Sequence, residues 1–248
     1  MTIGMSPDED AKAVHRGAAS AVGLPVHRTP SGWMRKSNLA LACFGIFMVF
    51  LVAQSFTGWH TYNTDQESHA QPVVSYLEYL TTGHFVEATF ENWESEFLQM
   101  GAFIMLTAFF VQRGSAESKR EDQADPADED PRRHRDDPDA PWPVRRGGPW
   151  LRLYENSLLI AFVLLFLGSI AGHALGGARE YSEDQLTHGE QAVSTVEFIT
   201  TSQFWFESFQ NWQSEFLAVG SIVVLTIFLR QRSSPESKPV HARHRETD

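Results

Sequence analysis

The sequence is almost without cysteine. Cys43 is the single cysteine among 248 residues, which excludes a disulfide framework and a zinc site built from cysteines. Basic residues are outnumbered, with 20 Lys and Arg against 31 Asp and Glu, and the net charge of -11 argues against a general nucleic-acid-binding protein. We recognise no catalytic motif, so a protein without enzymatic activity and without a cofactor is the first expectation.

The sequence does contain four apolar runs between polar segments. Membrane-spanning helices are expected at 37–56, 92–111, 157–175 and 211–229. The first and third runs have the length that a bilayer core requires, whereas the second and fourth also fit buried core helices. Trp93 and Trp212 favour spanning, because each extends its run back to an aromatic interface anchor. A signal peptide is not expected in the first run, since a long arm precedes it and no cleavage pattern follows.

The chain repeats itself with an offset of 119 residues. FENWESEFLQMG at 90–101 aligns with FQNWQSEFLAVG at 209–220, and QRGSAESK at 112–119 aligns with QRSSPESK at 231–238. Over a stretch of 62 residues, 28 positions match. Each copy holds two expected spans, so the copies are parallel. The predicted fold is therefore an all-α membrane protein of two helical hairpins, with amphipathic helices in the outer loops.

The polar segments complete the expected organisation. We expect a disordered arm at 1–32, hairpins at 33–119 and 150–238, a disordered charged linker at 120–149 and a tail at 239–248. Of the 20 Lys and Arg residues, 19 lie in or beside the arm, the linker and the tail, and one lies in the outer loops. The positive-inside rule then predicts a multi-pass protein of the plasma membrane, surrounded by lipid bilayer, with both termini cytoplasmic.

Four polar residues are expected at one depth near the outer membrane face. They are Gln54, Glu96, His173 and Glu215. Ionisable groups in membrane helices usually face the bundle interior and pair, which favours ion or proton permeation through this layer. Four helices leave little room for a pore, so permeation would require a homodimer. The alternative is interfacial: both glutamates lie at the membrane edge and reach water.

A second candidate site lies in the outer loops. An Asp and a His four residues apart recur in both copies, each with a glutamate downstream: Asp65, His69, Glu78, Asp184, His188 and Glu197. Two such pairs facing each other across a pseudo-twofold axis would make a metal site, since Asp and His at this spacing share a helix face. The alternative is a network of hydrogen bonds and helix caps that fixes the loop.

The cytoplasmic ends of the hairpins carry a repeated polar motif. It comprises Gln112, Arg113, Ser115, Glu117, Lys119, Gln231, Arg232, Ser234, Glu236 and Lys238. Basic residues in this position are typical of contacts with anionic lipid headgroups. The repeated Ser and Glu leave open the docking of an unidentified membrane or cytoplasmic protein. Gly168, Gly172 and Gly176 in the third run predict a close helix approach, within the bundle or between copies.

These motifs together resemble a known family. TGWHTYNTDQESH, TTGHFVEATFENWESEFLQM and QRGSAESK are similar to segments of a bacterial family of small membrane proteins, classed as a domain of unknown function. The resemblance covers residues 33–119 and 150–238 and implies a bacterial membrane protein with four spans. It implies no activity and no catalytic residue. The expected function is a structural or partner-binding protein of the cell envelope, with ion permeation and metal binding as alternatives.

Overall fold

The computed structural model describes residues 37–119 and 125–245. These residues form helices joined by turns and contain no strand. The four long helices are α3 (Asn38–Ser68), α5 (Gly83–Phe109), α8 (Ser157–Thr187) and α10 (Ser202–Phe228). The arm predicted at 1–32 lies outside the described residues.

The chain divides into two compact units after Val52. Within the described residues, the first unit consists of the N-terminal part of α3. Its apolar side chains, such as Leu39, Phe44 and Phe50, are exposed, as is typical of a helix that lipid surrounds. The second unit begins at Ala53 and holds the remaining helices.

Helices α3, α8 and α10 are long and apolar enough to cross a membrane. The prediction of an all-α protein with membrane-length apolar helices is confirmed at this level. Helix α5 has 27 residues, as many as α10, but its first half contains four glutamates and is correspondingly less apolar. Three of these glutamates, Glu87, Glu91 and Glu94, belong to the candidate site.

The helices follow the sequence repeat in their boundaries. Helix α8 begins and ends 119 residues after α3, and α10 does the same relative to α5. Between the long helices lie the short helices α4 (Tyr76–Tyr79) and α9 (Thr195–Ile199), each opened by a capping box. The expected outer-loop helices are therefore only about one turn long. Polar extensions of α3 and α8 form most of the outer region instead.

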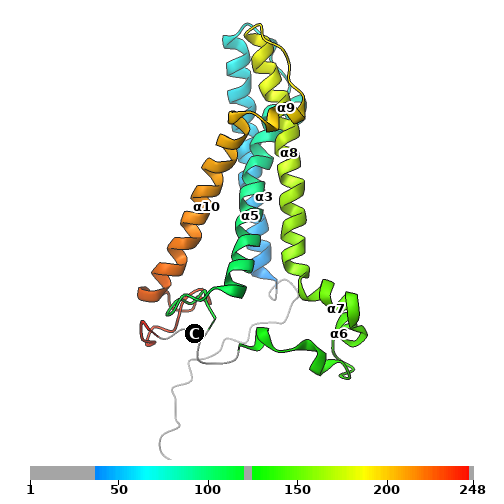
Figure 1. Ribbon diagram of the computed structural model, residues 1–248. Coiled ribbons are helices and arrows are strands. Elements are labelled where there is room, and N and C mark those ends of the chain that lie inside the picture. The colour runs from blue at the N-terminus through cyan, green and yellow to red at the C-terminus, as the bar shows by residue number, and fades with distance from the viewer. Residues whose placement is uncertain (1–36, 120–124, 246–248) are drawn as a thin grey trace, which may run out of the picture. The chain divides into compact units, whose positions relative to one another are not determined.

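Glycines bring α5 and α8 together, as Figure 1 shows for the two ribbons. A Cβ atom added at Gly172 would lie 2.5 Å from the ring of Phe90, and one added at Gly176 would lie 2.5 Å from the backbone nitrogen of Glu87. Gly168 has open space around its Cβ position. Two of the three predicted contact glycines therefore face α5, within the bundle, while α10 packs on the other side of α5.

The described part of the charged linker, from residue 125 onward, contains local order. Four short helices follow one another there: η1 (Pro126–Asp128), η2 (Pro131–His134), α6 (Trp142–Arg146) and α7 (Gly148–Glu155). They lie within and just after the segment for which the composition predicts a disordered linker, 120–149. The physical reason is local, because Asp125 and Asp130 accept hydrogen bonds from amides two residues ahead and a proline follows each.

Candidate functional site

The candidate site surrounds His173, which is fully buried in the middle of α8. The close approach at Gly172 and Gly176 turns one face of α5 toward this histidine. Glu87, Glu91 and Glu94 lie at positions i, i+4 and i+7 of α5, so their side chains share that face. The site therefore depends on a helix contact that small residues permit.

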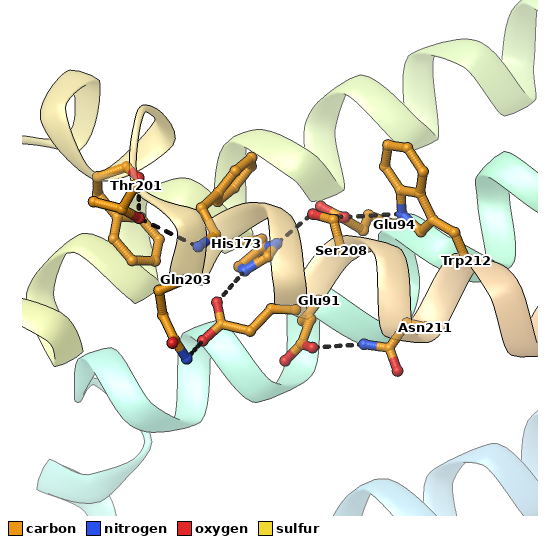
Figure 2. Close-up of polar contacts among 11 residues, drawn as sticks. Glu91, Glu94, His173, Thr201, Gln203, Ser208, Asn211 and Trp212 are labelled. Carbon is orange, nitrogen blue, oxygen red and sulfur yellow. Dashed lines mark hydrogen bonds and ion pairs between the residues drawn. The ribbon is translucent and has the colours of Figure 1, made fainter.

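Glu94 forms a hydrogen bond with one ring nitrogen of His173. Its side chain is fully buried, and its Oε2 atom lies 3.0 Å from His173 Nδ1. Its Oε1 atom accepts hydrogen bonds from Ser208 Oγ at 2.8 Å and from Trp212 Nε1 at 3.1 Å, both on α10 (Figure 2). An indole N–H can only donate, so Glu94 acts as an acceptor here. With Glu94 ionised, the bond between its Oε2 atom and His173 Nδ1 requires that Nδ1 carries the proton and donates it.

Glu207 faces the other ring nitrogen. Its Oε2 atom lies 3.3 Å from His173 Nε2, and its Oε1 atom accepts a hydrogen bond from Gln203 (Figure 2). The ring of Phe204 stacks on the imidazole, with centroids 4.8 Å apart and planes inclined by 28°. The orientation of the imidazole is thus fixed by a carboxylate on each side and an aromatic ring over one face.

Two further carboxylates complete the cluster. Glu87 offers an oxygen that lies within 4.8 Å of ligand atoms of both His173 and Glu207. Glu91 accepts a hydrogen bond of 2.6 Å from Asn211 Nδ2. We name Glu87, Glu91, Glu94, His173 and Glu207 the His173 centre.

The His173 centre has an excess of acidic groups. Four carboxyl groups surround one imidazole, which can supply at most a single positive charge. All of the side chains are buried or half-buried between helices. Charge in such surroundings is costly unless an opposite charge balances it. The arrangement can balance this charge by protonation of carboxyl groups or by binding a cation.

The family follows from a match over most of the chain. The family model described as a domain of unknown function, DUF6766, matches residues 30–248. The chain belongs to this family. No curated protein and no solved structure matches it. Membership of DUF6766 agrees with the resemblance seen in the sequence motifs but names no activity, so the functional argument rests on the site.

Of the predicted polar layer, His173 alone belongs to the centre. Glu96 is exposed, and Gln54 and Glu215 are half-buried. The carboxylates of Glu96 and Glu215 are close enough for their charges to interact. Among the described hydrogen bonds and ion pairs, none joins Gln54, Glu96 or Glu215 to His173. The DUF6766 structure thus gathers a different set of acids around the predicted histidine.

The two Asp–His pairs meet at the outer tip. The Nδ1 atom of His69 lies 3.0 Å from the backbone oxygen of Asp65, and that of His188 lies 2.9 Å from the backbone oxygen of Asp184. The two imidazole rings are 6.5 Å apart. The two histidines therefore lie side by side, and each Nδ1 atom contacts the end of its own helix.

Glu78 and Glu197, the two glutamates of the predicted metal site, serve as helix caps. Glu78 accepts a hydrogen bond from the backbone N–H of Ser75, and Glu197 accepts one from that of Ser194. These bonds lower the pKa of both carboxyl groups, because they stabilise the charged form. Both side chains turn toward their own helix starts and bond there, as the alternative of a capping network predicts.

The two predicted anchors differ in their surroundings. Trp212 donates its indole N–H to Glu94 and so forms part of the support of the site. Trp93 packs against Phe90, with ring centroids 5.2 Å apart. Sequence position makes the two tryptophans equivalent, but Glu94, the acid that Trp212 contacts, has the neutral Gln213 at the equivalent position in the second copy.

The repeated serines of the cytoplasmic motif shape turns. Ser118 Oγ accepts a hydrogen bond from the Gln112 amide at 2.8 Å, and Ser237 Oγ accepts the equivalent bond from Gln231 at 2.8 Å. In the same way, Ser115 and Ser234 accept bonds from the amides of residues 117 and 236. Local turn geometry therefore accounts for the repeated serines.

The charged residues of the motif have distinct environments. Lys119 pairs with Asp128, and the buried Lys238 donates to the backbone oxygens of residues 243 and 244. Arg113 and Arg232 are exposed, where they are free to meet solvent or lipid headgroups. Burial and the neighbouring Glu236 raise the pKa of Glu117.

The acids that build the centre were missed by the sequence reasoning. Glu87, Glu91, Glu94 and Glu207 align with Phe206, Gln210, Gln213 and Ala88 in the other copy. The repeat highlights positions that both copies share, and these acids stand at positions where the copies differ. The available signal was the helical spacing of Glu87, Glu91 and Glu94, which lie just before and within the second run, together with a histidine in the third.

Proposed function

We propose that this DUF6766 protein is a bacterial plasma-membrane protein of four spans, arranged as two parallel hairpins with both termini cytoplasmic. The common 119-residue offset of the helix boundaries supports the two hairpins. The 27 residues of α5 correspond to a length of about 40 Å, which suffices for a hydrocarbon core of about 30 Å. Glu87, Glu91 and Glu94 are buried or half-buried against the neighbouring helices, whereas Glu96 is exposed.

We propose further that the protein binds a cation inside its helix bundle. The observation that carries this function is the fully buried His173, whose two ring nitrogens both face carboxylates while further acids crowd around it. A bound cation would offset the excess negative charge of the His173 centre and hold α5, α8 and α10 together. Ionisable groups at such depth in membrane helices commonly mark ion sites.

A structural or partner-binding role is the second candidate. The observation in its favour is that Glu94 accepts hydrogen bonds from α8 and α10 at once. In that role the centre fastens the two hairpins to each other and needs no bound ion. The two candidates differ in whether cations alter the stability of the purified protein.

The test is the cation dependence of thermal unfolding in detergent micelles. The purified protein is stripped with chelator and then given Na⁺, K⁺, Mg²⁺, Ca²⁺ or Zn²⁺, with choline chloride as the control for ionic strength. We expect at least one cation to raise the unfolding temperature, because a ligand at 100 times its Kd stabilises the folded state by about 2.7 kcal/mol. The double variant Glu87→Gln, Glu207→Gln should lose this response.

The matched control is the double variant Glu96→Gln, Glu215→Gln, which removes the same number of charges outside the centre. It should respond to cations as the natural protein does. If no cation raises the unfolding temperature more than choline does, the cation-binding function is overturned and the structural role is favoured. Flux of the stabilising cation into proteoliposomes then separates transport from binding alone.

A further inference from the structure

The donor atoms of the His173 centre define the kind of cation. We propose that the centre holds one divalent transition-metal ion, bound by His173 Nε2 and by the carboxylates of Glu87 and Glu207. The ligand atoms of these three residues lie within 4.8 Å of one another and come from α8, α5 and α10. This inference rests on the proposed cation-binding function and adds the ligand set and the class of metal.

The distances suit an ion placed among the three side chains. Bonds from a transition-metal ion to imidazole nitrogen and carboxylate oxygen are about 2.0–2.2 Å long. The contact between His173 Nε2 and Glu207 Oε2 is 3.3 Å, longer than most charge-assisted hydrogen bonds. Glu87 and Glu207 are half-buried, which leaves their side chains room to rotate toward an ion.

The surroundings select the tautomer that a metal ligand requires. A histidine that binds a metal through Nε2 must keep its proton on Nδ1, and a carboxylate that accepts this proton fixes the ring. Glu94 is that carboxylate, and it is itself held by Ser208 and Trp212. Gln203 orients Glu207 in the same manner. The residues behind the ligands thus form a supporting layer typical of metal sites.

The chemistry of the donors favours a transition metal over Mg²⁺ or Ca²⁺. Those two ions prefer oxygen ligands throughout, whereas an imidazole nitrogen suits Zn²⁺, Fe²⁺, Co²⁺ or Ni²⁺. One imidazole and two carboxylates leave coordination positions open to water. The ion would lie between three helices of the bundle, where it compensates the acids that crowd there.

The experiment uses the full-length protein without an affinity tag, in nanodiscs, with Zn²⁺ and Co²⁺ alone as probes. We expect one equivalent of zinc by elemental analysis after desalting, and a visible absorption band from bound Co²⁺. Glu87→Gln and Glu207→Gln should each lose stoichiometric metal. Both side chains are half-buried, so these variants test the site even where His173→Asn does not fold.

Glu94→Gln tests the positioning role of Glu94. It should weaken metal binding by about 10–100-fold and shift the Co²⁺ band, because the imidazole loses its fixed tautomer. An unchanged band and unchanged affinity would overturn that role. The controls are Glu96→Gln and the double variant His69→Ala, His188→Ala, which should both retain one equivalent of zinc.

Three outcomes would overturn the proposal in different ways. Stabilisation by Na⁺, Mg²⁺ or Ca²⁺ without stoichiometric zinc or cobalt would refute the transition-metal site and leave the cation-binding function standing. Metal that survives Glu87→Gln but disappears in His69→Ala, His188→Ala would place the site at the outer tip. A protein that responds to no cation would refute this inference and the proposed function together.

Discussion

At the scale of single residues, Glu94 shows how strongly one buried group is constrained. It accepts hydrogen bonds from three donors on two helices: His173 Nδ1, Ser208 Oγ and Trp212 Nε1. In Glu94→Gln one of the two terminal atoms becomes a donor and faces another donor. We expect a loss of about 1–3 kcal/mol in the free energy of unfolding, measured by chemical unfolding in mixed micelles.

Glu96 provides the control for this change, since it lies two residues further along α5 and is exposed. Glu96→Gln should stay within about 0.5 kcal/mol of the natural protein. Equal effects of the two substitutions would contradict the role assigned to Glu94.

A second residue-scale prediction concerns pH at the turn that follows α5. The pKa of Glu117 lies above its ordinary value of 4.5, through burial and the nearby Glu236. The folded state therefore holds this proton more tightly than the unfolded state. Its stabilising contribution is complete below pH 4.5 and is lost as the pH rises through the folded-state pKa. Hydrogen exchange of residues 112–119 should accordingly accelerate, beyond the intrinsic effect of pH, between pH 4.5 and neutrality.

Glu236→Gln removes the facing charge and should weaken this pH dependence of exchange. Glu155→Gln, on the exposed end of α7, is the control and should leave the pH profile unchanged. Identical profiles for the natural protein and Glu236→Gln would refute the coupling between the two glutamates.

At the scale of elements, the contact between α5 and α8 places the acids beside His173. Gly176→Ala adds a Cβ atom 2.5 Å from a backbone nitrogen of α5, and backbone cannot rotate away as a side chain can. We expect a loss of about 1–3 kcal/mol from the strain of overpacking, measured as a lower unfolding temperature.

Gly168→Ala is the matched control on the same helix. Its Cβ meets open space, and alanine favours a helix over glycine by about 1 kcal/mol, so this variant should be unchanged or more stable. If Gly168→Ala destabilised the protein as much as Gly176→Ala, helix packing would not explain the glycine spacing.

The positions of the long helices were predictable from hydropathy, but their ends were not. The apolar runs locate α3 and α8, but both helices continue through polar residues to Ser68 and Thr187. Their continuation depends on contacts that hydropathy does not record. The side chain of Asn63 hydrogen-bonds to both the N–H and the C=O of Val74, and Ser182 does the same with Val193. These bonds hold each returning loop against its helix.

The site was predictable only in part, for a related reason. His173 stood out as an ionisable residue in an apolar run. Its partners on α5 depend on helix rotation and on the glycine contact, which depth along the chain does not reveal. The repeat drew attention to positions shared by both copies, whereas the centre lies where the copies differ. Charge is concentrated on the α5 side, and the second copy has neutral residues there.

At the scale of the whole molecule, the number of spans can be decided by which side of the membrane each loop faces. With four spans, residues 71 and 190 lie outside, and residues 137 and 240 lie in the cytoplasm. With α5 excluded, so that α3, α8 and α10 alone cross, residues 71 and 137 share one side and residue 190 lies on the other. The two topologies therefore predict different pairings of the same four exposed positions.

Single cysteines can report these positions, because the chain has one native cysteine to remove. In a Cys43→Ser background, we expect Gln71→Cys and Glu190→Cys to react with a membrane-impermeant maleimide on intact cells. Asp137→Cys and Val240→Cys should react only after permeabilisation. Labelling of Gln71→Cys and Asp137→Cys from one side, with Glu190→Cys protected, would mean that α5 does not cross the membrane. The acids of α5 would then not lie at membrane depth, and the burial of charge that motivates a bound cation would have to come from helix packing alone.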